Sequence, residues 1–242
     1  MSIKLTGFKR RFALAVILGA YGCSGPSQES GEALDDAEFT QAYPPGEAAW
    51  RLAEHRADTS ELVASLDRIL DWHKANDTDL VLNAPMSRDD LIAELAWLPC
   101  QVPEELLALW TWRNGERTDR FIWYHRLLSA ADAKDEYRRL TTEPYYIWNP
   151  NWIPVFEHPE EWYFVECSDR PSTGSPVSLY FIETGPSYSY VNLTTYMKTM
   201  AAALEAGAIS WQDGDWADEI RELAAIHARF NETGMFPYAV DP

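Results

Sequence analysis

Histidine and cysteine are the residues that most readily bind metals, and this chain has five of the first and three of the second. No two histidines stand four residues apart and no cysteines form a Cys-x-x-Cys pair, which are the spacings typical of zinc sites. Single histidines such as His73 and His227 fall on apolar helical faces, where packing is their usual role. We therefore predict no metal and no cofactor.

Carboxylates are abundant, but their spacing predicts no catalytic pair. The adjacent acids at 104–105 and 160–161 could serve a glycosidase, yet acids at turns and helix starts are ordinarily solvated. Asp213-Gly-Asp215 resembles a calcium loop only faintly, because the alternating oxygen ligands are missing. The sequence also lacks the nucleophile elbow, the phosphate-binding loop and the dinucleotide fingerprint. We predict a non-enzymatic protein without catalytic residues.

Aromatic residues are concentrated between positions 145 and 190, in greater number than the core of a small sheet needs. Exposed aromatic rings beside acids often form the centre of a protein–protein interface. The alternative is that these rings pack beneath flanking helices, as large hydrophobic side chains usually do. The candidate partner surface comprises Trp148, Glu160, Glu161, Trp162, Tyr188 and Tyr190.

The chain of 242 residues has 20 Lys and Arg against 38 Asp and Glu, a formal net charge of −18. This acidity disfavours nucleic-acid binding, which requires a basic surface. Hydrophobic residues make up 46% of the chain and aromatic residues 13%, a composition that excludes wholesale disorder. Electrostatics favours a basic partner, although the charge also serves solubility.

The first 22 residues are typical of an export signal peptide. Four basic residues precede an apolar run at 12–20 that is too short to span a bilayer. Small residues and then Cys23 follow, which resembles a bacterial lipoprotein signal whose cysteine receives the lipid. Secretion after Gly22 and an uncleaved anchor are alternatives. Cleavage would leave 16 basic and 38 acidic residues, a formal charge of −22, on a periplasm-facing envelope protein.

Residues 23–45 contain Ser, Gly, Pro and acids with little periodicity, so we predict a flexible acidic tether before a domain at 46–242. Two cysteines remain in that domain, Cys100 and Cys167. In an oxidising periplasm they could form a disulfide, and the alternative is two buried free thiols.

Periodicity and turn residues predict an α+β fold with N-terminal helices, a central antiparallel sheet and C-terminal helices. Ser87 and the Ser129-x-x-Asp132 capping box indicate two helix starts, and Asn114-Gly115 indicates a helix end. Short β-prone runs separated by turns predict an antiparallel meander at 152–156, 162–165, 177–182 and 188–191. Helices are expected near 49–53, 60–76, 87–95, 103–113, 129–140, 194–206 and 215–231.

Several of these pieces occur in an ordered series. A Leu-Pro precedes the helix that Pro103 opens, an Asn-Gly follows it, and Trp-Ile-Pro begins the first strand. The series resembles the SUKH superfamily, the Smi–Knr domain of fungal cell-wall regulators and bacterial immunity proteins, over roughly 59–207. Because turn residues serve backbone needs first, we interpret the motif as a fold signature. Its residues are Leu98, Pro99, Pro103, Asn114, Gly115, Trp152 and Pro154.

The resemblance implies a protein-binding module, an immunity-type protein that neutralises a toxin at the cell envelope. An envelope scaffold or regulatory lipoprotein is the alternative, and a cell-wall glycan hydrolase is a remote one. The acidity favours a basic toxin, with contact to the membrane only through the N-terminal lipid.

Lipidation can be measured directly. We expect Cys23→Ser to abolish incorporation of a fatty-acid analogue in growing cells, because its thiol is the predicted lipid acceptor. In-gel detection on the purified protein, beside the wild type, measures the label. Label that survives the substitution contradicts lipidation at this residue.

Overall fold

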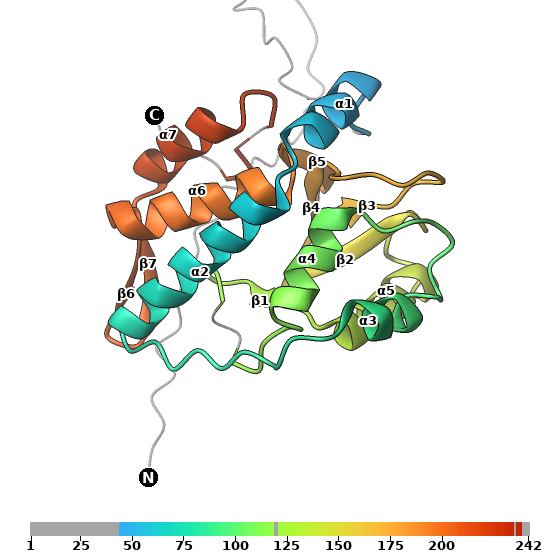
Figure 1. Cartoon of the computed structure of the whole chain (residues 1–242). Helices are drawn as coiled ribbons and strands as arrows, with labels where there is room; N and C mark the ends of the chain where they lie inside the picture. The colour runs from blue at the N-terminus through green and yellow to red at the C-terminus, as the bar shows by residue number, and fades with distance from the viewer. Residues whose placement is uncertain (1–43, 119–120, 235, 239–242) are drawn as a thin grey trace, which may run out of the picture. The chain divides into compact units, whose positions relative to one another are not determined.

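The helices and strands of the computed structural model follow the predicted order (Figure 1). The structure describes residues 44–118, 121–234 and 236–238. In this part of the chain, helices stand before and after a central antiparallel sheet, so the predicted α+β class is confirmed. The predicted signal at 1–22 lies outside the described residues, as do Cys23 and all of the tether except Pro44 and Pro45. The described residues belong to one unit that spans 40–242.

In the described residues, four helices precede the first strand, and local capping side chains fix the starts of two of them. Asp58 accepts hydrogen bonds from the backbone N–H groups of Ser60 and Glu61, and Ser87 accepts one from Asp90. The predicted helices in this region are confirmed to within a few residues. They are α1 (Glu47–Arg56), α2 (Thr59–Ala75), α3 (Arg88–Glu94) and α4 (Glu104–Trp112).

The four predicted strands are confirmed and form an antiparallel meander. A short strand that the sequence does not predict, β1, completes the order β1-β2-β3-β4-β5. The register shifts between Pro154 and Phe156, so Pro154 lies beside a bulge. The elements are β1 (Arg126–Leu127), α5 (Ala130–Thr142), β2 (Trp152–His158), β3 (Glu161–Glu166), β4 (Val177–Phe181) and β5 (Gly185–Tyr190).

The predicted role of Asn114-Gly115 needs correction. An extended residue, Arg113, already caps α4, and Gly115 reaches a left-handed φ of 82° only two residues later. The side-chain oxygen of Asn114 accepts the backbone N–H of Ala130 at 2.9 Å. A Cβ on Gly115 would lie 2.4 Å from the backbone nitrogen of Ser129. The pair therefore positions the start of α5, and only glycine fits both the left-handed backbone and the close contact.

The C-terminal region differs from the prediction after α6 (Leu193–Ala206), which Asn192 caps and Gly207 ends. The predicted helix over 215–231 is wrong in its first part, since β6 (Ile209–Gln212) and β7 (Asp215–Asp218) form a hairpin before α7 (Ile220–Phe230). Asp213 and Gly214 have φ values of 53° and 85°. These are the two left-handed positions of a tight hairpin turn, for which Asp-Gly is a preferred pair.

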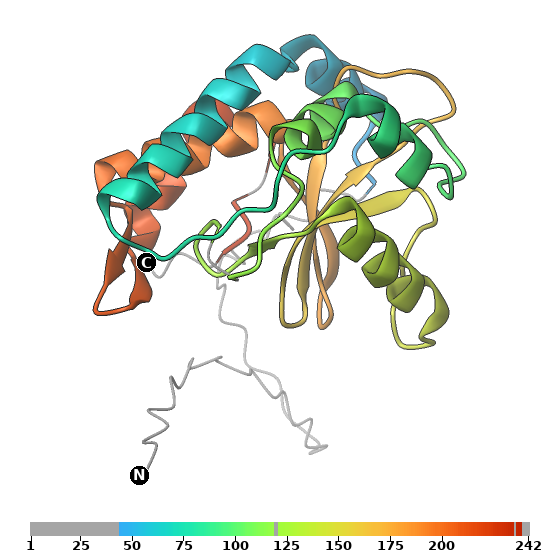
Figure 2. The ribbon, with the colours of Figure 1, turned by 60° about the horizontal axis from the view of Figure 1, so that its bottom comes forward.

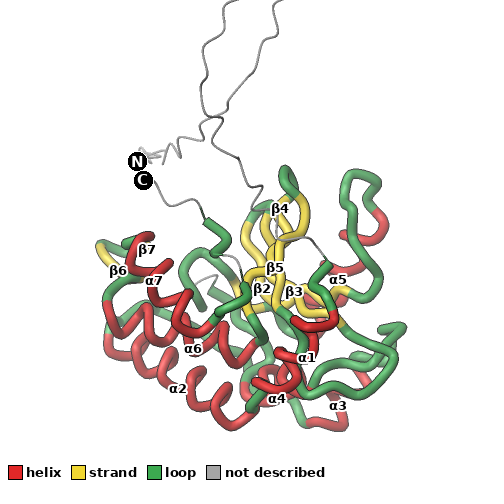
Figure 3. Tube along the Cα trace, turned by 90° about the horizontal axis from the view of Figure 1, so that it is seen from above, coloured by secondary structure: helices red, strands yellow, loops and turns green. Residues whose placement is uncertain are grey.

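The central sheet is apolar on both faces, and both faces are covered (Figure 2). On one face the strands join α2, α4 and α6 in the main core, and α2, α6 and α7 lie side by side (Figure 3). On the other face, α5 and the segment after it cover a smaller aromatic cluster. Its buried members are Leu140, Trp148, Trp152, Trp162, Phe164 and Tyr180.

A disulfide joins the connection before α4 to the end of β3. The Cα atoms of Cys100 and Cys167 are 5.6 Å apart, and the pairing is the first of the two alternatives that we considered. Beside it, the N–H of Gln101 donates to the carbonyl of Ser168 at 2.8 Å and the reverse bond measures 3.2 Å. The disulfide therefore stands in a short stretch of paired backbone between segments distant in sequence.

A buried carboxyl joins the N-terminal ends of α4 and α6. Glu105 is 1% exposed, and its Oε1 accepts the backbone N–H of Thr194 at 2.8 Å. A Cβ on Gly174 would lie 2.6 Å from the other oxygen, Oε2, and 2.7 Å from the Cβ of Ala57, so glycine is required at this close approach. Burial raises the pKa of Glu105 to about 7, although hydrogen bonds from Thr194 oppose the shift.

The raised pKa of Glu105 predicts a loss of stability with rising pH. The unfolded chain releases this proton near pH 4.5 and the folded chain near pH 7, so the free energy of unfolding falls between these values by about 3 kcal/mol. Glu105→Gln removes the titration. In urea titrations, we expect the difference in the free energy of unfolding, variant minus wild type, to increase by this amount between pH 4.5 and pH 7.

The difference between two proteins is measured because other groups titrate as well. Burial lowers the pKa of His73 to about 4, so this histidine destabilises the fold as the pH falls from 6.5 to about 4, the opposite sense. Glu104→Gln is the matched control, because Glu104 adjoins Glu105 but is paired with Arg88 on the surface at 2.7 Å. A difference curve for Glu105→Gln as flat as that of the control contradicts the proton linkage.

Candidate functional site

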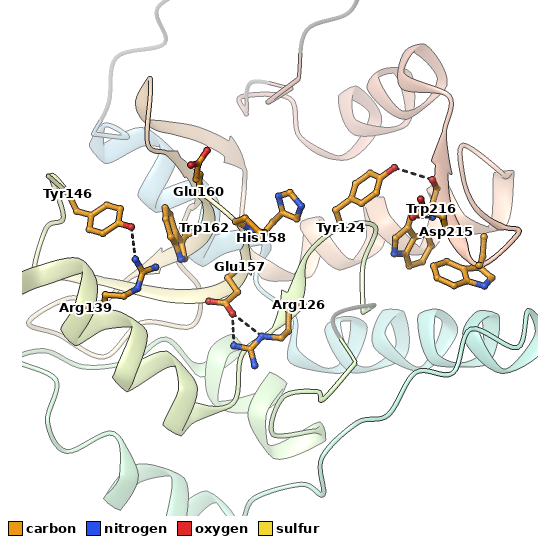
Figure 4. Close-up of a pocket in the computed structure, with 13 residues that line it drawn as sticks. Tyr124, Arg126, Arg139, Tyr146, Glu157, His158, Glu160, Trp162, Asp215 and Trp216 are labelled. Carbon is orange, nitrogen blue, oxygen red and sulfur yellow. Dashed lines mark hydrogen bonds and ion pairs between the residues drawn. The ribbon is translucent and has the colours of Figure 1, made fainter. Parts of the chain in front are cut away.

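A pocket of about 740 Å³ opens where the β2–β3 hairpin meets α5 and the β6–β7 hairpin (Figure 4). Its aromatic residues fall into two groups. The Arg139 side comprises Arg139, Tyr146 and Trp162, and the Asp215 side comprises Tyr124, Trp211, Asp215 and Trp216. Arg126, Glu157, His158 and Glu160 lie between them.

On the Arg139 side, a cation of the chain itself lies against aromatic rings. The guanidinium carbon of Arg139 is 5.1 Å from the ring centre of Tyr146 and 5.4 Å from that of Trp162, distances typical of a cation–π contact. Arg139 also pairs with Glu136 one turn earlier on α5 and donates to the hydroxyl of Tyr146. The indole N–H of Trp162 donates to Glu136 at 2.6 Å. The carboxylate of Glu136 thus holds both the guanidinium of Arg139 and the ring of Trp162.

Between the two sides, a second arginine is neutralised in the same way. The Nε of Arg126, on β1, donates to Glu157 of β2 at 2.9 Å, and its Nη1 lies 3.5 Å from Asp132 at the start of α5. Burial raises the pKa of Glu157, and Arg126 opposes that shift. The strand pairing of Arg126 with Glu157 places the two side chains opposite each other.

On the Asp215 side, the β6–β7 hairpin supplies rings and a carboxylate. The ring of Trp216 stacks on Trp72 of α2 at 5.9 Å and meets Trp211 edge-on at 5.3 Å, which anchors the hairpin. The hydroxyl of Tyr124 donates to the carbonyl of Trp216 at 3.0 Å. Asp215 accepts the backbone N–H of Trp216 at 2.8 Å, so its carboxylate is held at the mouth of the pocket.

The pocket carries excess negative charge. Both of its arginines are paired with carboxylates, whereas neither Glu160 nor Asp215 has an ion-pair partner among the residues that the structure describes. Glu160 stands in the two-residue turn of the β2–β3 hairpin with a φ of 70°, and it is exposed. An arrangement of rings with unpaired carboxylates is suited to a cationic ligand.

The predicted partner surface is largely wrong. Of its six residues, only Glu160 is exposed, and the others are buried because the sheet is covered on both faces. Glu160 and Trp162 do line the pocket. The unbroken apolar run 162–165 was the signal for this outcome, since a strand buried on both faces shows no polar alternation. The buried residues are Trp148, Glu161, Trp162, Tyr188 and Tyr190.

The adjacent acids that could have formed catalytic pairs point to different environments. Glu105 is buried and Glu104 is paired with Arg88 at the surface. Glu161 is buried 3.3 Å from Nε2 of His125, whereas Glu160 faces the pocket.

The residues of the fold-signature motif serve the fold. None of them lines the pocket, and they lie in the connection before α4, at its N-cap, at the start of α5, and at the start and bulge of β2. The structure thus gives structural positions to Leu98, Pro99, Pro103, Asn114, Gly115, Trp152 and Pro154.

The sequence did not predict the pocket residues outside the 145–190 segment, which are Tyr124, Arg126, Arg139, Trp211, Gly214, Asp215 and Trp216. Among these residues, only Asp215 and Trp216 could have been placed directly after a turn, by the Asp-Gly hairpin signal at 213–214.

The described residues contain no group of three or more His, Cys, Asp and Glu arranged to hold a metal ion. No helix in the same part of the chain is long and apolar enough to cross a membrane.

No protein-family model matches this chain, and no curated protein matches its sequence.

The stacked arginine of the pocket predicts a measurable stability effect. Arg139→Met is expected to lower the free energy of unfolding by about 1–2 kcal/mol, because it removes a cation–π contact and leaves Glu136 without its ion pair. Arg138→Met is the matched control, since Arg138 pairs only with exposed Asp135 on the same helix. Urea unfolding measures both, and equal losses in the two variants contradict a role for the stacked guanidinium.

Proposed function

We propose that this protein is a non-enzymatic protein-binding module of the bacterial envelope, and that a basic partner docks on the pocket between α5 and the β6–β7 hairpin. The carrying observation is the pocket itself, which combines aromatic rings with carboxylates, and the arginines among its described residues are already paired. Aromatic residues are enriched at protein interfaces, and a charge-complementary partner would be drawn to this face.

The charge of the whole chain supports the same partner chemistry. A formal charge of −18, or −22 after removal of the predicted signal, raises the association rate of a basic protein at moderate ionic strength. The disulfide supports export, because such bonds persist in oxidising compartments. Together with the lipoprotein-like N-terminus, these features favour a periplasm-facing module tethered through Cys23.

Within this proposal, the resemblance to the SUKH superfamily favours an immunity-type role, in which the module neutralises a basic toxin acting in the envelope. A scaffold or regulatory lipoprotein would use the same pocket for resident envelope proteins. The hydrolase alternative has less support, since the adjacent carboxylates that could have formed its catalytic pair lie in different environments.

Affinity purification of the mature protein from its native envelope, followed by mass spectrometry, tests the function. An immunity protein is expected to retain one stoichiometric effector, whereas a scaffold retains several housekeeping proteins. Deletion of the gene is then expected to sensitise cells to that effector. Absence of any specific partner contradicts the proposal.

The site is tested by reversing its charge. Asp215→Lys is expected to weaken binding of the purified partner by about tenfold or more, because the new lysine repels a basic partner. Asp89→Lys, an exposed residue of α3 outside the pocket, makes the same charge change and is the matched control. Equal weakening by the two variants, measured by calorimetry, would show general electrostatics instead of a site.

A further inference from the structure

Two large apolar side chains lie in solvent on the segment that follows α5. Ile147 is 80% exposed and Tyr145 is 59% exposed, the two highest values among the large hydrophobic side chains that the structure describes. We call these two residues the exposed pair. An isoleucine in water contributes little to folding, because apolar side chains stabilise a fold through burial. Exposed apolar side chains that stand together are typical of interaction sites.

The packing of the neighbouring rings explains why this pair is exposed. Along the segment, Tyr146 and Trp148 face the protein, and the exposed pair alternates with them. Tyr146 packs edge-on against Trp162 with 5.5 Å between the ring centres, and Trp148 belongs to the buried aromatic cluster beneath α5. The two inward rings complete the cover of the sheet, so the residues beside them point outward.

The backbone that carries the exposed pair is held in place. The N–H of Ile147 donates to the hydroxyl of Tyr180 on β4 at 3.1 Å, and the N–H of Tyr146 donates to the carbonyl of Glu143 at 3.2 Å. The ring centre of Tyr145 lies 4.4 Å from that of Tyr146. A partner that covers the pair therefore loses little free energy in ordering this segment.

The carboxylates nearest to the exposed pair carry uncompensated negative charge. Glu143 precedes the pair on the same segment, and Glu160 lines the same pocket as Tyr146 (Figure 4). Both glutamates are exposed, and neither has an ion-pair partner among the described residues. Arg139, which lies against the ring of Tyr146, is paired with Glu136. The apolar pair is thus accompanied by acids and not by free cations of this part of the chain.

These charges favour a basic protein over two other occupants of the exposed pair. A second copy of the chain would bring the same glutamates and a net charge of −18, so the two chains would repel each other. An anionic lipid surface would repel the glutamates as well. A basic protein segment with apolar side chains complements both the charge and the exposed rings.

We propose that a protein partner covers the exposed pair with an apolar side chain flanked by basic residues. The proposal rests on the proposed function and adds an apolar anchor beside the pocket that attracts the partner's charge. The apolar contact excludes water, while lysine or arginine side chains next to it pair with Glu143 and Glu160. An amphipathic basic segment meets both requirements, whereas a uniformly basic surface meets only the second.

The probe is a helical peptide amide of leucine and lysine, about 15 residues long because shorter helices are marginal in water. The readout is the Cδ1 methyl signal of Ile147 in NMR titrations, which we expect to shift saturably. The signal of Ile92, an exposed isoleucine on α3, is expected to stay in place. Two matched peptides, with glutamate for lysine or serine for leucine, are each expected to bind at least about tenfold more weakly.

Substitution of the isoleucine tests the apolar contact. Ile147→Ser is expected to weaken binding of the leucine–lysine peptide by about fivefold or more, because it removes apolar surface from the contact. Ile92→Ser makes the same change at another exposed isoleucine and is expected to leave the affinity unchanged. Both side chains are exposed, and urea unfolding checks that both variants fold. An absent shift at Ile147, an equal shift at Ile92, or an unchanged affinity in Ile147→Ser overturns the proposal.

The two other occupants are measured with the same substitution. Vesicles of phosphatidylethanolamine and phosphatidylglycerol are mixed with Cys23→Ser protein, so that the predicted lipid does not contribute, and we expect no binding through the exposed pair. Sedimentation is expected to show a monomer. Vesicle binding or a dimer that Ile147→Ser abolishes assigns the pair to lipid or to a second copy, and either result overturns the proposal.

Failure of this inference and failure of the proposed function are distinguishable. A purified envelope partner that binds Ile147→Ser as tightly as the wild type contradicts the apolar anchor alone. Saturable binding of the leucine–lysine peptide at Ile147, in a protein that retains no envelope partner, contradicts the proposed function and leaves the surface standing.

Discussion

A sheet that is apolar on both faces is the constraint on which the rest of this structure depends. Successive residues of β3 point in turn to the two sides, so that Tyr163 joins the main core while Trp162 and Phe164 join the smaller cluster. Neither face can be left in water, because each carries large rings whose burial is a main source of stability. The helices α2, α4 and α6 cover one face, and α5 with the following segment covers the other.

The pocket arises where the cover of the second face ends. At this border the buried rings give way to charged side chains, and each arginine there is placed by an element that also serves the core: Arg126 by β1 and Arg139 by α5. The β6–β7 hairpin closes the other side through its stack on α2. The rings that complete the core also provide the surfaces over which cations lie, so the same packing forms both the fold and the proposed binding site.

The proposed function rests on the chemistry of the pocket more than on the fold-signature motif. The residues of the fold-signature motif serve turns, caps and a bulge, so a resemblance built on them concerns the backbone more than a reaction. Glu105 illustrates the same distinction, because a buried carboxyl with a raised pKa stands at a junction of helices and away from the pocket. The raised pKa of Glu105 follows from its burial at this junction.

The sequence by itself determined most of the elements, because their signals are local: capping residues such as Ser87 and Ser129, helical periodicity, and turn residues between β-prone runs. It misassigned the region 215–219, although the Asp-Gly turn before it carried the hairpin signal. Only the tertiary structure decided which aromatic rings are buried, since that depends on which segments cover the second face of the sheet. It also decided the pocket, whose residues come from β1 and the segment before it, α5 and the segment after it, the β2–β3 hairpin and the β6–β7 hairpin. No local pattern encodes that juxtaposition, because packing between segments distant in the chain creates it.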